Sequence, residues 1–258
     1  MKRTVFYIAL IGIFSAILFF STSSTIAKQK DAQMNETDNN SFVIMVLFTS
    51  QGCSSCPPAD AILGAYAGKN DERIMPMAFH VDYWNRLGWI DSFSNAAFSQ
   101  RQNWYAQKWN TSSIYTPQVI INGQKQMVGS DEIKIASAVN TFLKEKASVT
   151  ITITAMEIIK NEVQLTYKIN GNIQGLNING ALLQKKAVTQ IKRGENRGVK
   201  LDNYNVVRDF KTIDRPGISG KMALQLPSGD DAQNYLVVLF AQDIEDGLIK
   251  AAVKENCK

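Results

Sequence analysis

The chain of 258 residues has few of the side chains from which metal sites and disulfide frameworks are built, because it holds three cysteines and one histidine. A zinc site made of several histidines is therefore excluded, and any catalytic triad that needs a histidine must use His80. Three cysteines also exclude a framework of several disulfides. Proline is scarce, with six residues, and 45% of the chain is apolar, which is typical of an ordinary globular protein rather than a disordered or fibrous one.

The amino terminus has the pattern of a secretory signal peptide. Lys2 and Arg3 precede an apolar run from Val5 to Phe20, and a small polar stretch follows. We predict a signal peptide over residues 1–27, cleaved after Ala27. The alternative is an uncleaved signal anchor. The apolar run is short for an anchor, because the hydrocarbon core of a membrane is about 30 Å thick. The predicted location is periplasmic or extracellular, where a disulfide persists. Export argues against nucleic acid as a partner, and cleavage lowers the net charge from +5 to +3 because two basic residues are lost.

The mature chain divides by its patterns into a polar leader and two segments with different periodicities. Residues 28–41 are almost entirely polar, which predicts a flexible leader. Residues 42–147 then alternate between buried-strand and helix patterns, in the order strand, helix, strand, helix, strand, strand, helix. The predicted strands are 42–48, 74–81, 118–121 and 125–128, and the predicted helices are 59–67, 94–109 and 131–146.

After Ala147 the sequence consists of short alternating strands separated by turn residues. Seven such strands in succession are typical of a β-sandwich. We therefore predict an α/β domain over residues 42–147, followed by an all-β, sandwich-like domain over residues 148–258. The seven predicted strands are 149–154, 163–169, 181–191, 204–210, 222–226, 235–241 and 248–253.

The chemistry of the chain is expected at Cys53-Ser54-Ser55-Cys56, between the first predicted strand and the first predicted helix. Two cysteines separated by two residues can close a small loop, and the N–H groups at a helix start favour thiolate over thiol. Thiolate is the reactive species in disulfide exchange. Thr116-Pro117 directly precedes the strand 118–121, and because X-Pro bonds supply nearly all cis peptides, we expect a cis bond there.

A CxxC motif between a strand and a helix, with Thr-Pro before a later strand, resembles the thioredoxin fold. The segments 47–60, 79–84, 87–89, 115–118, 194–198 and 205–208 more closely resemble an uncharacterised family of secreted bacterial thioredoxin-like proteins, a domain of unknown function. This resemblance covers nearly the whole mature chain. It implies that Cys53 is the nucleophile, that Cys56 is the resolving thiol, and that Pro117 is a cis-proline beside the disulfide, with the backbone of Thr116 available to a substrate chain.

Two features depart from the pattern of thioredoxins. Pro57 and Pro58 directly follow the CxxC motif, and proline disfavours helical geometry in the residue before it, so we expect the helix to start at one of these prolines. The first strand also lacks a buried acid, since Val46 stands where this family is expected to carry glutamate. Asp60, one turn beyond the second cysteine, and Asp82, at the end of the second strand, are the candidate proton acceptors instead.

Three functions fit these residues. The first is an exported thiol–disulfide oxidoreductase that acts on protein or small-molecule thiols and disulfides through Cys53 and Cys56, with no cofactor and no membrane contact beyond the signal segment. The second is a periplasmic copper-binding or delivery protein, because two thiolates and His80 form a soft ligand set suited to Cu(I). The third is a binding module in which the CxxC pair is a permanent structural disulfide.

Three further features have both a plain and a functional interpretation. The segment 192–198 is expected to be a connecting turn, with an anion-binding loop as the alternative. The aromatic residues between 83 and 115 are expected to form a core, or else a substrate groove that Arg86 and Arg101 line. Cys257 is expected to be an incidental thiol on a frayed tail; the alternatives are an intermolecular disulfide and a third thiol that resolves Cys53.

Overall fold

The computed structural model describes residues 40–258 with the exception of residue 70. The predicted signal peptide, and the leader up to residue 39, lie outside the described residues. Residues from Asn39 onward form one compact unit. Within the described part of the chain, no helix is both long enough and apolar enough to cross a membrane.

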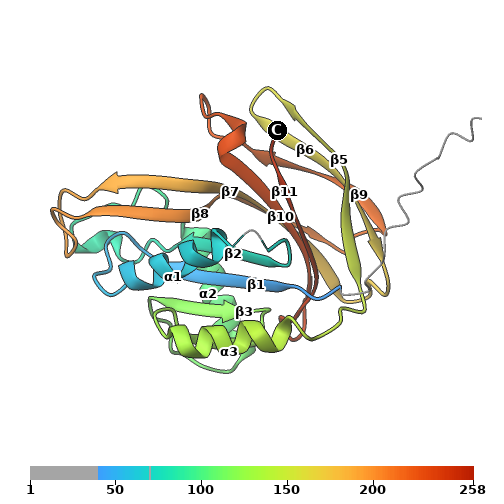
Figure 1. The fold of residues 1–258 in the computed structure, drawn as a ribbon, viewed down its shortest axis with the longest axis horizontal. Coiled ribbons are helices and arrows are strands. Elements are labelled where there is room, and N and C mark those ends of the chain that lie inside the picture. The colour runs from blue at the N-terminus through green and yellow to red at the C-terminus, as the bar shows by residue number, and fades with distance from the viewer. Residues whose placement is uncertain (1–39, 70) are drawn as a thin grey trace, which may run out of the picture. The chain divides into compact units, whose positions relative to one another are not determined.

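A mixed sheet of eight strands is the central element of this unit, in the order β11-β10-β7-β8-β2-β1-β3-β4 (Figure 1). A second sheet has three strands in the order β5-β6-β9. The strands are β1 (Val43–Thr49), β2 (Ile74–His80), β3 (Gln118–Ile121), β4 (Lys125–Val128), β5 (Thr150–Ile159), β6 (Glu162–Asn170), β7 (Leu176–Gln190), β8 (Lys200–Asp214), β9 (Ser219–Gln225), β10 (Tyr235–Asp243) and β11 (Ile249–Asn256). The helices are α1 (Pro57–Ala67), α2 (Ala96–Lys108) and α3 (Glu132–Phe142), with short 3-10 turns η1 (Asn85–Leu87) and η2 (Ala232–Asn234).

Strand β1 is buried on both faces and separates two layers of the core. Its odd-numbered residues from Val43 to Leu47 pack with α1 and α3, and its even-numbered residues from Ile44 to Phe48 pack with α2. This division follows from the strand period of two, which sends successive side chains to opposite faces. β1 pairs in parallel with β2 and antiparallel with β3, so it lies inside the sheet.

The predicted fold class is wrong. The chain is mostly β, and it does not form a thioredoxin-like α/β domain followed by an all-β domain. Strand β8, from the second half of the chain, pairs in parallel with β2, so strands from both halves belong to one sheet. The pairing places Ala78 opposite Val206, and beside it the side-chain amide of Asn205 donates to the carbonyl of Pro76 at 2.9 Å. A strand edge offers unpaired N–H and C=O groups, and here a strand of the second half of the chain satisfies those of β2.

Close backbone approaches at two glycines reinforce this junction. A Cβ atom built on Gly64 of α1 would lie 2.4 Å from the ring of Tyr204 in β8, so only glycine allows the helix to pack on that strand. Gly123, in the β3–β4 turn, has a φ of +69°. A Cβ at this position would lie 2.0 Å from the carbonyl oxygen of Gly247, in the β10–β11 turn. The two halves of the chain therefore share one packed structure.

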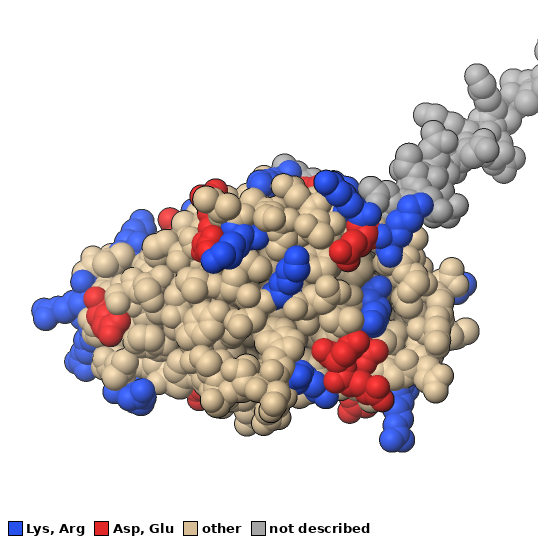
Figure 2. Space-filling view, turned by 90° about the horizontal axis from the view of Figure 1, so that it is seen from below, with Lys and Arg blue, Asp and Glu red and all other residues tan. Residues whose placement is uncertain are grey.

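The three-stranded sheet contributes apolar side chains to a further core cluster, together with β7 and β10. Cys257 belongs to this cluster and is 3% exposed, so the prediction of a frayed tail is wrong. The predicted strands and helices of the described region are all present, with the largest boundary differences in β5, β7 and β8. Figure 2 shows one face of the molecule, on which basic and acidic side chains are interspersed and no continuous basic area is seen.

Candidate functional site

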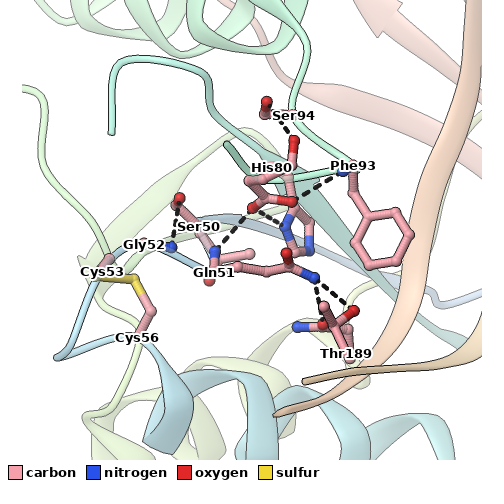
Figure 3. Close-up of polar contacts among 12 residues, drawn as sticks. Ser50, Gln51, Gly52, Cys53, Cys56, His80, Phe93, Ser94 and Thr189 are labelled. Carbon is pink, nitrogen blue, oxygen red and sulfur yellow. Dashed lines mark hydrogen bonds and ion pairs between the residues drawn. A yellow bond between two sulfur atoms is a disulfide. The ribbon is translucent and has the colours of Figure 1, made fainter. Parts of the chain in front are cut away.

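Cys53 and Cys56 form a disulfide at the start of α1, with their Cα atoms 5.4 Å apart (Figure 3). The helix begins at Pro57 with Cys56 as its N-cap, as the two prolines predict. We call residues 50–56 the CxxC turn. It is closed by backbone hydrogen bonds from Cys53 to Ser50 and from Cys56 to Cys53, each 3.2 Å long. Both cysteines are 0% exposed, so the disulfide is covered.

The Thr116–Pro117 peptide bond is cis, which confirms the prediction. Trp84 connects this bond to the CxxC turn. Its indole N–H donates to the hydroxyl of Thr116 at 2.7 Å. On the other side, a Cβ atom built on Gly52 would lie 3.4 Å from the Cβ of Trp84. The structure thus places the cis-proline loop and the disulfide turn on either side of one tryptophan.

Asp60 is a buried carboxyl group one helical turn after Cys56. Its backbone N–H donates to the carbonyl of Cys56, and its side chain, in a residue only 5% exposed, accepts a hydrogen bond of 3.1 Å from the hydroxyl of Thr49. Burial raises the pKa of Asp60 to about 7, although the nearby His80 acts in the opposite direction. Asp60 is therefore poised to exchange a proton near neutral pH.

Asp82, the second predicted proton acceptor, is occupied elsewhere. Its carboxylate accepts a hydrogen bond of 2.5 Å from the hydroxyl of Ser99, and its backbone N–H donates to the same hydroxyl at 3.1 Å. These contacts hold the end of β2 against α2. The structure thus gives the two acids different environments, and Asp60 is the one on the helix that carries the disulfide.

His80 and Asp91 form an ion pair beneath the CxxC turn, with Nδ1 and Oδ2 2.7 Å apart and both side chains 0% exposed. Burial lowers the pKa of His80, whereas the charge and hydrogen bond of Asp91 raise it. The net shift of this pKa is upward. For Asp91, burial raises the pKa. The charge and hydrogen bond of His80 and the N–H groups of Gln51 and Phe93 lower it, and the resulting pKa lies below its usual range. Among the described residues, Nε2 of His80 has no hydrogen-bond partner.

Gln51 ties the CxxC turn to its surroundings. Its backbone N–H donates to Asp91 at 2.8 Å, and its side-chain amide donates to Thr189 at 2.9 Å and to Asn203 at 3.3 Å. Its side-chain oxygen accepts from the indole of Trp89 at 3.1 Å. The turn is therefore held by β7 and β8 as well as by the ion pair, as Figure 3 shows for Thr189.

Residues 191–199, which we call the β7–β8 loop, contact the exposed side of the CxxC turn. The carboxylate of Glu195 accepts from the N–H of Ser54 at 3.1 Å and from its hydroxyl at 2.7 Å. The hydroxyl and N–H of Ser54 lower the pKa of Glu195. A segment expected to be only a connecting turn thus places a negative charge beside the CxxC motif.

Asn196 of the same loop is buried and reaches further into the turn. Its side-chain amide donates to the carbonyl of Gln51 at 2.9 Å and to the carbonyl of Cys53 at 3.0 Å. The first of these bonds joins residues 145 positions apart in sequence. Asn196 therefore fixes the backbone of the turn.

Residues 44–242 match a family model described as Protein of unknown function (DUF1223). The chain belongs to this family. The crystal structure of protein AGR_C_4864 from Agrobacterium tumefaciens is similar to this DUF1223 protein, with 27% identity, a TM-score of 0.64, and coverage of 82% of this chain and 92% of that one. A β-glucosidase from Kluyveromyces marxianus also matches, with 10% identity over 42% of this chain and 14% of its own, but its TM-score is 0.21. No curated protein matches.

The metal ligands considered from the sequence are not gathered into a site. Among residues 40–258, residue 70 excepted, no group of three or more His, Cys, Asp and Glu side chains is arranged to hold a metal ion. The thiols of Cys53 and Cys56 are joined to each other, and His80 faces Asp91. The copper interpretation of this DUF1223 protein thus has no supporting geometry in the described residues.

Sequence reasoning missed Asp91 and the partners of the CxxC turn in the β7–β8 loop. The signal for Asp91 was weak, since it is a single acid in a short segment of mixed polar and apolar residues after Trp89. Glu195 and Asn196 lay within a segment that the family resemblance had already singled out. Cys257 is a free thiol whose burial raises its pKa to about 11, which disfavours the reactive thiolate.

Proposed function

We propose that this protein is an exported thiol–disulfide oxidoreductase that acts through Cys53 and Cys56. The observation that carries the proposal is the position of the pair, which forms a disulfide at the start of α1 with the buried carboxyl group of Asp60 one turn away. A cis-proline loop, linked to the CxxC turn through Trp84, adds support. Buried acids with shifted pKa values cluster at functional sites.

The exchange uses the two sulfurs in sequence. In the reduced protein, the Cys53 thiolate attacks a substrate disulfide, which forms a mixed disulfide and releases one substrate thiolate. Cys56 then loses its proton and attacks the sulfur of Cys53. This second step forms the Cys53–Cys56 disulfide and releases the other substrate thiolate, so the substrate gains two electrons and the protein loses two. The reverse sequence oxidises a dithiol substrate.

Asp60 is the proposed proton acceptor for Cys56. Because its pKa is about 7, a substantial fraction of the side chain is ionised at neutral pH and can accept the proton of a thiol. Its position on the same helix, four residues after Cys56, places it on the same side of α1. The pair His80–Asp91 positions Gln51 at the start of the turn, through the bond from the Gln51 N–H to Asp91.

Access to the disulfide requires movement of its cover. Both sulfur-bearing residues are 0% exposed, and in-line attack at a sulfur needs an open approach. The β7–β8 loop contacts the turn through side-chain bonds from only two of its residues, Glu195 and Asn196. We therefore place the opening at this loop, whose polar contacts can be exchanged for contacts with water.

Export is supported by the sequence of residues 1–27 and by the disulfide, because a disulfide persists in an oxidising compartment. The mature protein is expected to begin at Lys28. Amino-terminal sequencing of the protein recovered from the extracytoplasmic fraction tests this expectation. An intact Met1 in that fraction indicates the uncleaved anchor, and recovery only from the cytoplasm contradicts export.

The redox proposal is tested by equilibrating the mature protein with glutathione buffers and counting thiols. An active pair is expected to have a potential roughly between −270 and −120 mV, whereas structural disulfides usually lie below about −300 mV. A Cys56→Ser variant is expected to accumulate a mixed disulfide between Cys53 and a model disulfide, detected by mass spectrometry. Cys257→Ser is the matched control and is expected to leave the potential unchanged.

Two results overturn the proposal. One is a Cys53–Cys56 pair that stays oxidised across all glutathione buffers. The other is a reduced pair that transfers no electrons to a model disulfide. Either result assigns the disulfide a structural role. In that case, replacing both cysteines is expected to lower the stability of the protein and to have no other effect.

A further inference from the structure

Arg101 of α2 has surroundings that are unusual for a positive charge. Its guanidinium carbon lies 4.7 Å from the ring centre of Phe210 and 5.4 to 5.7 Å from three other aromatic ring centres. The other three rings are those of Phe79, Tyr105 and Phe240. Such contacts with ring faces are favourable for a cation, but they leave most of its hydrogen-bond donors unused.

The hydrogen bonds of Arg101 are few and all go to neutral groups. Its Nη2 donates to the side-chain oxygen of Gln242 at 2.8 Å and to the hydroxyl of Tyr105 at 3.3 Å. Its Nε is buried and has no partner among the described residues. No described carboxylate forms an ion pair with it, and burial lowers its pKa. A buried cation that lacks a counter-charge is unfavourable, and a bound anion removes that penalty.

A cavity of about 500 Å³, open to solvent, has Arg101 in its lining. Polar side chains from β7, β8 and β10 line it opposite α2, and Trp104 and Ile244 add apolar surface. The polar residues include Asn179, Thr212 and Gln242. None of the residues that line the cavity belongs to the disulfide site, so the cavity is a separate feature of the molecule. Its size and mixed lining suit a small molecule with one charged end.

The charges at the cavity select among anions. Arg101 is the single basic residue in the lining, and Asp214 is the single acidic one. One guanidinium matches the single charge of a carboxylate, and its Nη1, which forms no hydrogen bond among the described residues, can donate to it. A multiply charged phosphate has only one cation in the lining itself to pair with, since Lys108 at the edge donates to the carbonyl of Ile244, and the carboxylate of Asp214 repels additional negative charge.

We propose that this cavity binds a small molecule carrying a single carboxylate, with Arg101 as its counter-charge and Trp104 against its apolar part. The site is independent of the exchange reaction at Cys53 and Cys56. Binding at the cavity is expected whether or not the disulfide is redox-active.

The test is titration calorimetry of the mature protein with sodium benzoate, at constant ionic strength. Benzamide, which has the same shape and no charge, is the matched ligand control, and sulfate is the control for a general anion site. Benzoate is expected to bind, and benzamide and sulfate are expected to bind at least about tenfold more weakly, since a charge-assisted pair is lost.

Two variants locate the binding. Arg101→Gln is expected to weaken benzoate binding about tenfold or more, and Asp214→Asn is expected to strengthen it, because the repulsion is removed. The Asp214 variant and the comparison of benzoate with benzamide keep the test decisive even if the Arg101 variant does not fold. Equal binding of benzoate and benzamide, tighter binding of sulfate, or no binding of benzoate overturns the proposal.

Discussion

Replacing Asp60 by asparagine is expected to change how the stability of the protein depends on pH. Burial raises the pKa of this carboxyl group from 3.8 to about 7 in the folded protein. Between these two values the folded state holds a proton that the unfolded state has released. The free energy of unfolding therefore falls as pH rises through this window, and the contribution of Asp60 is constant above it.

The size of the effect follows from the two pKa values. Each pH unit in the window contributes about 1.4 kcal/mol, so the interval from 3.8 to about 7 corresponds to roughly 4 kcal/mol. Asp60→Asn keeps a side chain that can bond to the hydroxyl of Thr49 and removes the titrating proton. Relative to the wild type, the variant is expected to gain roughly 4 kcal/mol on going from pH 4 to pH 8.

Urea unfolding followed by tryptophan fluorescence measures this difference, with the disulfide intact and at pH values from 4 to 8. Asp82→Asn is the matched control, because it makes the same chemical change in an acid that is bonded to Ser99 on α2. This control measures the effect of replacing a hydrogen-bonded aspartate by asparagine at a position away from the disulfide helix. The ion pair of His80 and Asp91 is present in all three proteins, but the charge of Asp60 raises the pKa of His80, so the difference between the wild type and Asp60→Asn includes this coupling.

Parallel stability curves for the wild type and Asp60→Asn refute the reasoning. They show that Asp60 is ionised in the folded protein with an ordinary pKa. In that case Asp60 also loses its suitability as a proton acceptor near neutral pH.

Two further predictions concern the cover of the disulfide and the junction between the two halves of the chain. Asn196→Ala removes both bonds to the CxxC turn and is expected to speed reduction of the disulfide by dithiothreitol several-fold, measured by thiol release. The control is Asn205→Ala, which loses a similar buried bond elsewhere. Equal reduction rates in the two variants contradict the role assigned to Asn196. Gly64→Ala forces a Cβ against the ring of Tyr204 and is expected to cost about 1–3 kcal/mol in urea unfolding. Gly68→Ala, with ordinary contacts at 3.6 Å, is its control, and equal losses contradict close packing at this junction.

Much of the local structure was predictable because its causes lie within short windows of sequence. The continuous apolar run of residues 42–48 and the two prolines after Cys56 predicted a buried strand and the start of α1. The Thr116–Pro117 dipeptide predicted a cis bond for a similarly local reason. Asp60 was found by counting one helical turn from the second cysteine.

The predicted fold class, a thioredoxin-like α/β domain followed by an all-β domain, failed for a physical reason. A change from helix-containing to strand-only patterns at residue 147 shows which elements form, but not which strand edges pair. β2 has an open edge that any strand of suitable length can satisfy, and the pairing with β8 depends on the packing of Gly64 and Asn205 at the junction. The resemblance to thioredoxins rested on the CxxC motif, on Thr116-Pro117 and on the order of elements up to residue 147.

The sequence by itself determined that the chain carries a CxxC pair at a helix start, a cis-proline loop and one acid on the same helix. Only the tertiary structure decided that the disulfide is covered and what covers it. The bonds from Asn196 join residues 145 and 143 positions apart, and the ion pair of His80 with Asp91 forms across a loop. Such contacts arise from the way the strands assemble, and no local pattern of residues encodes them.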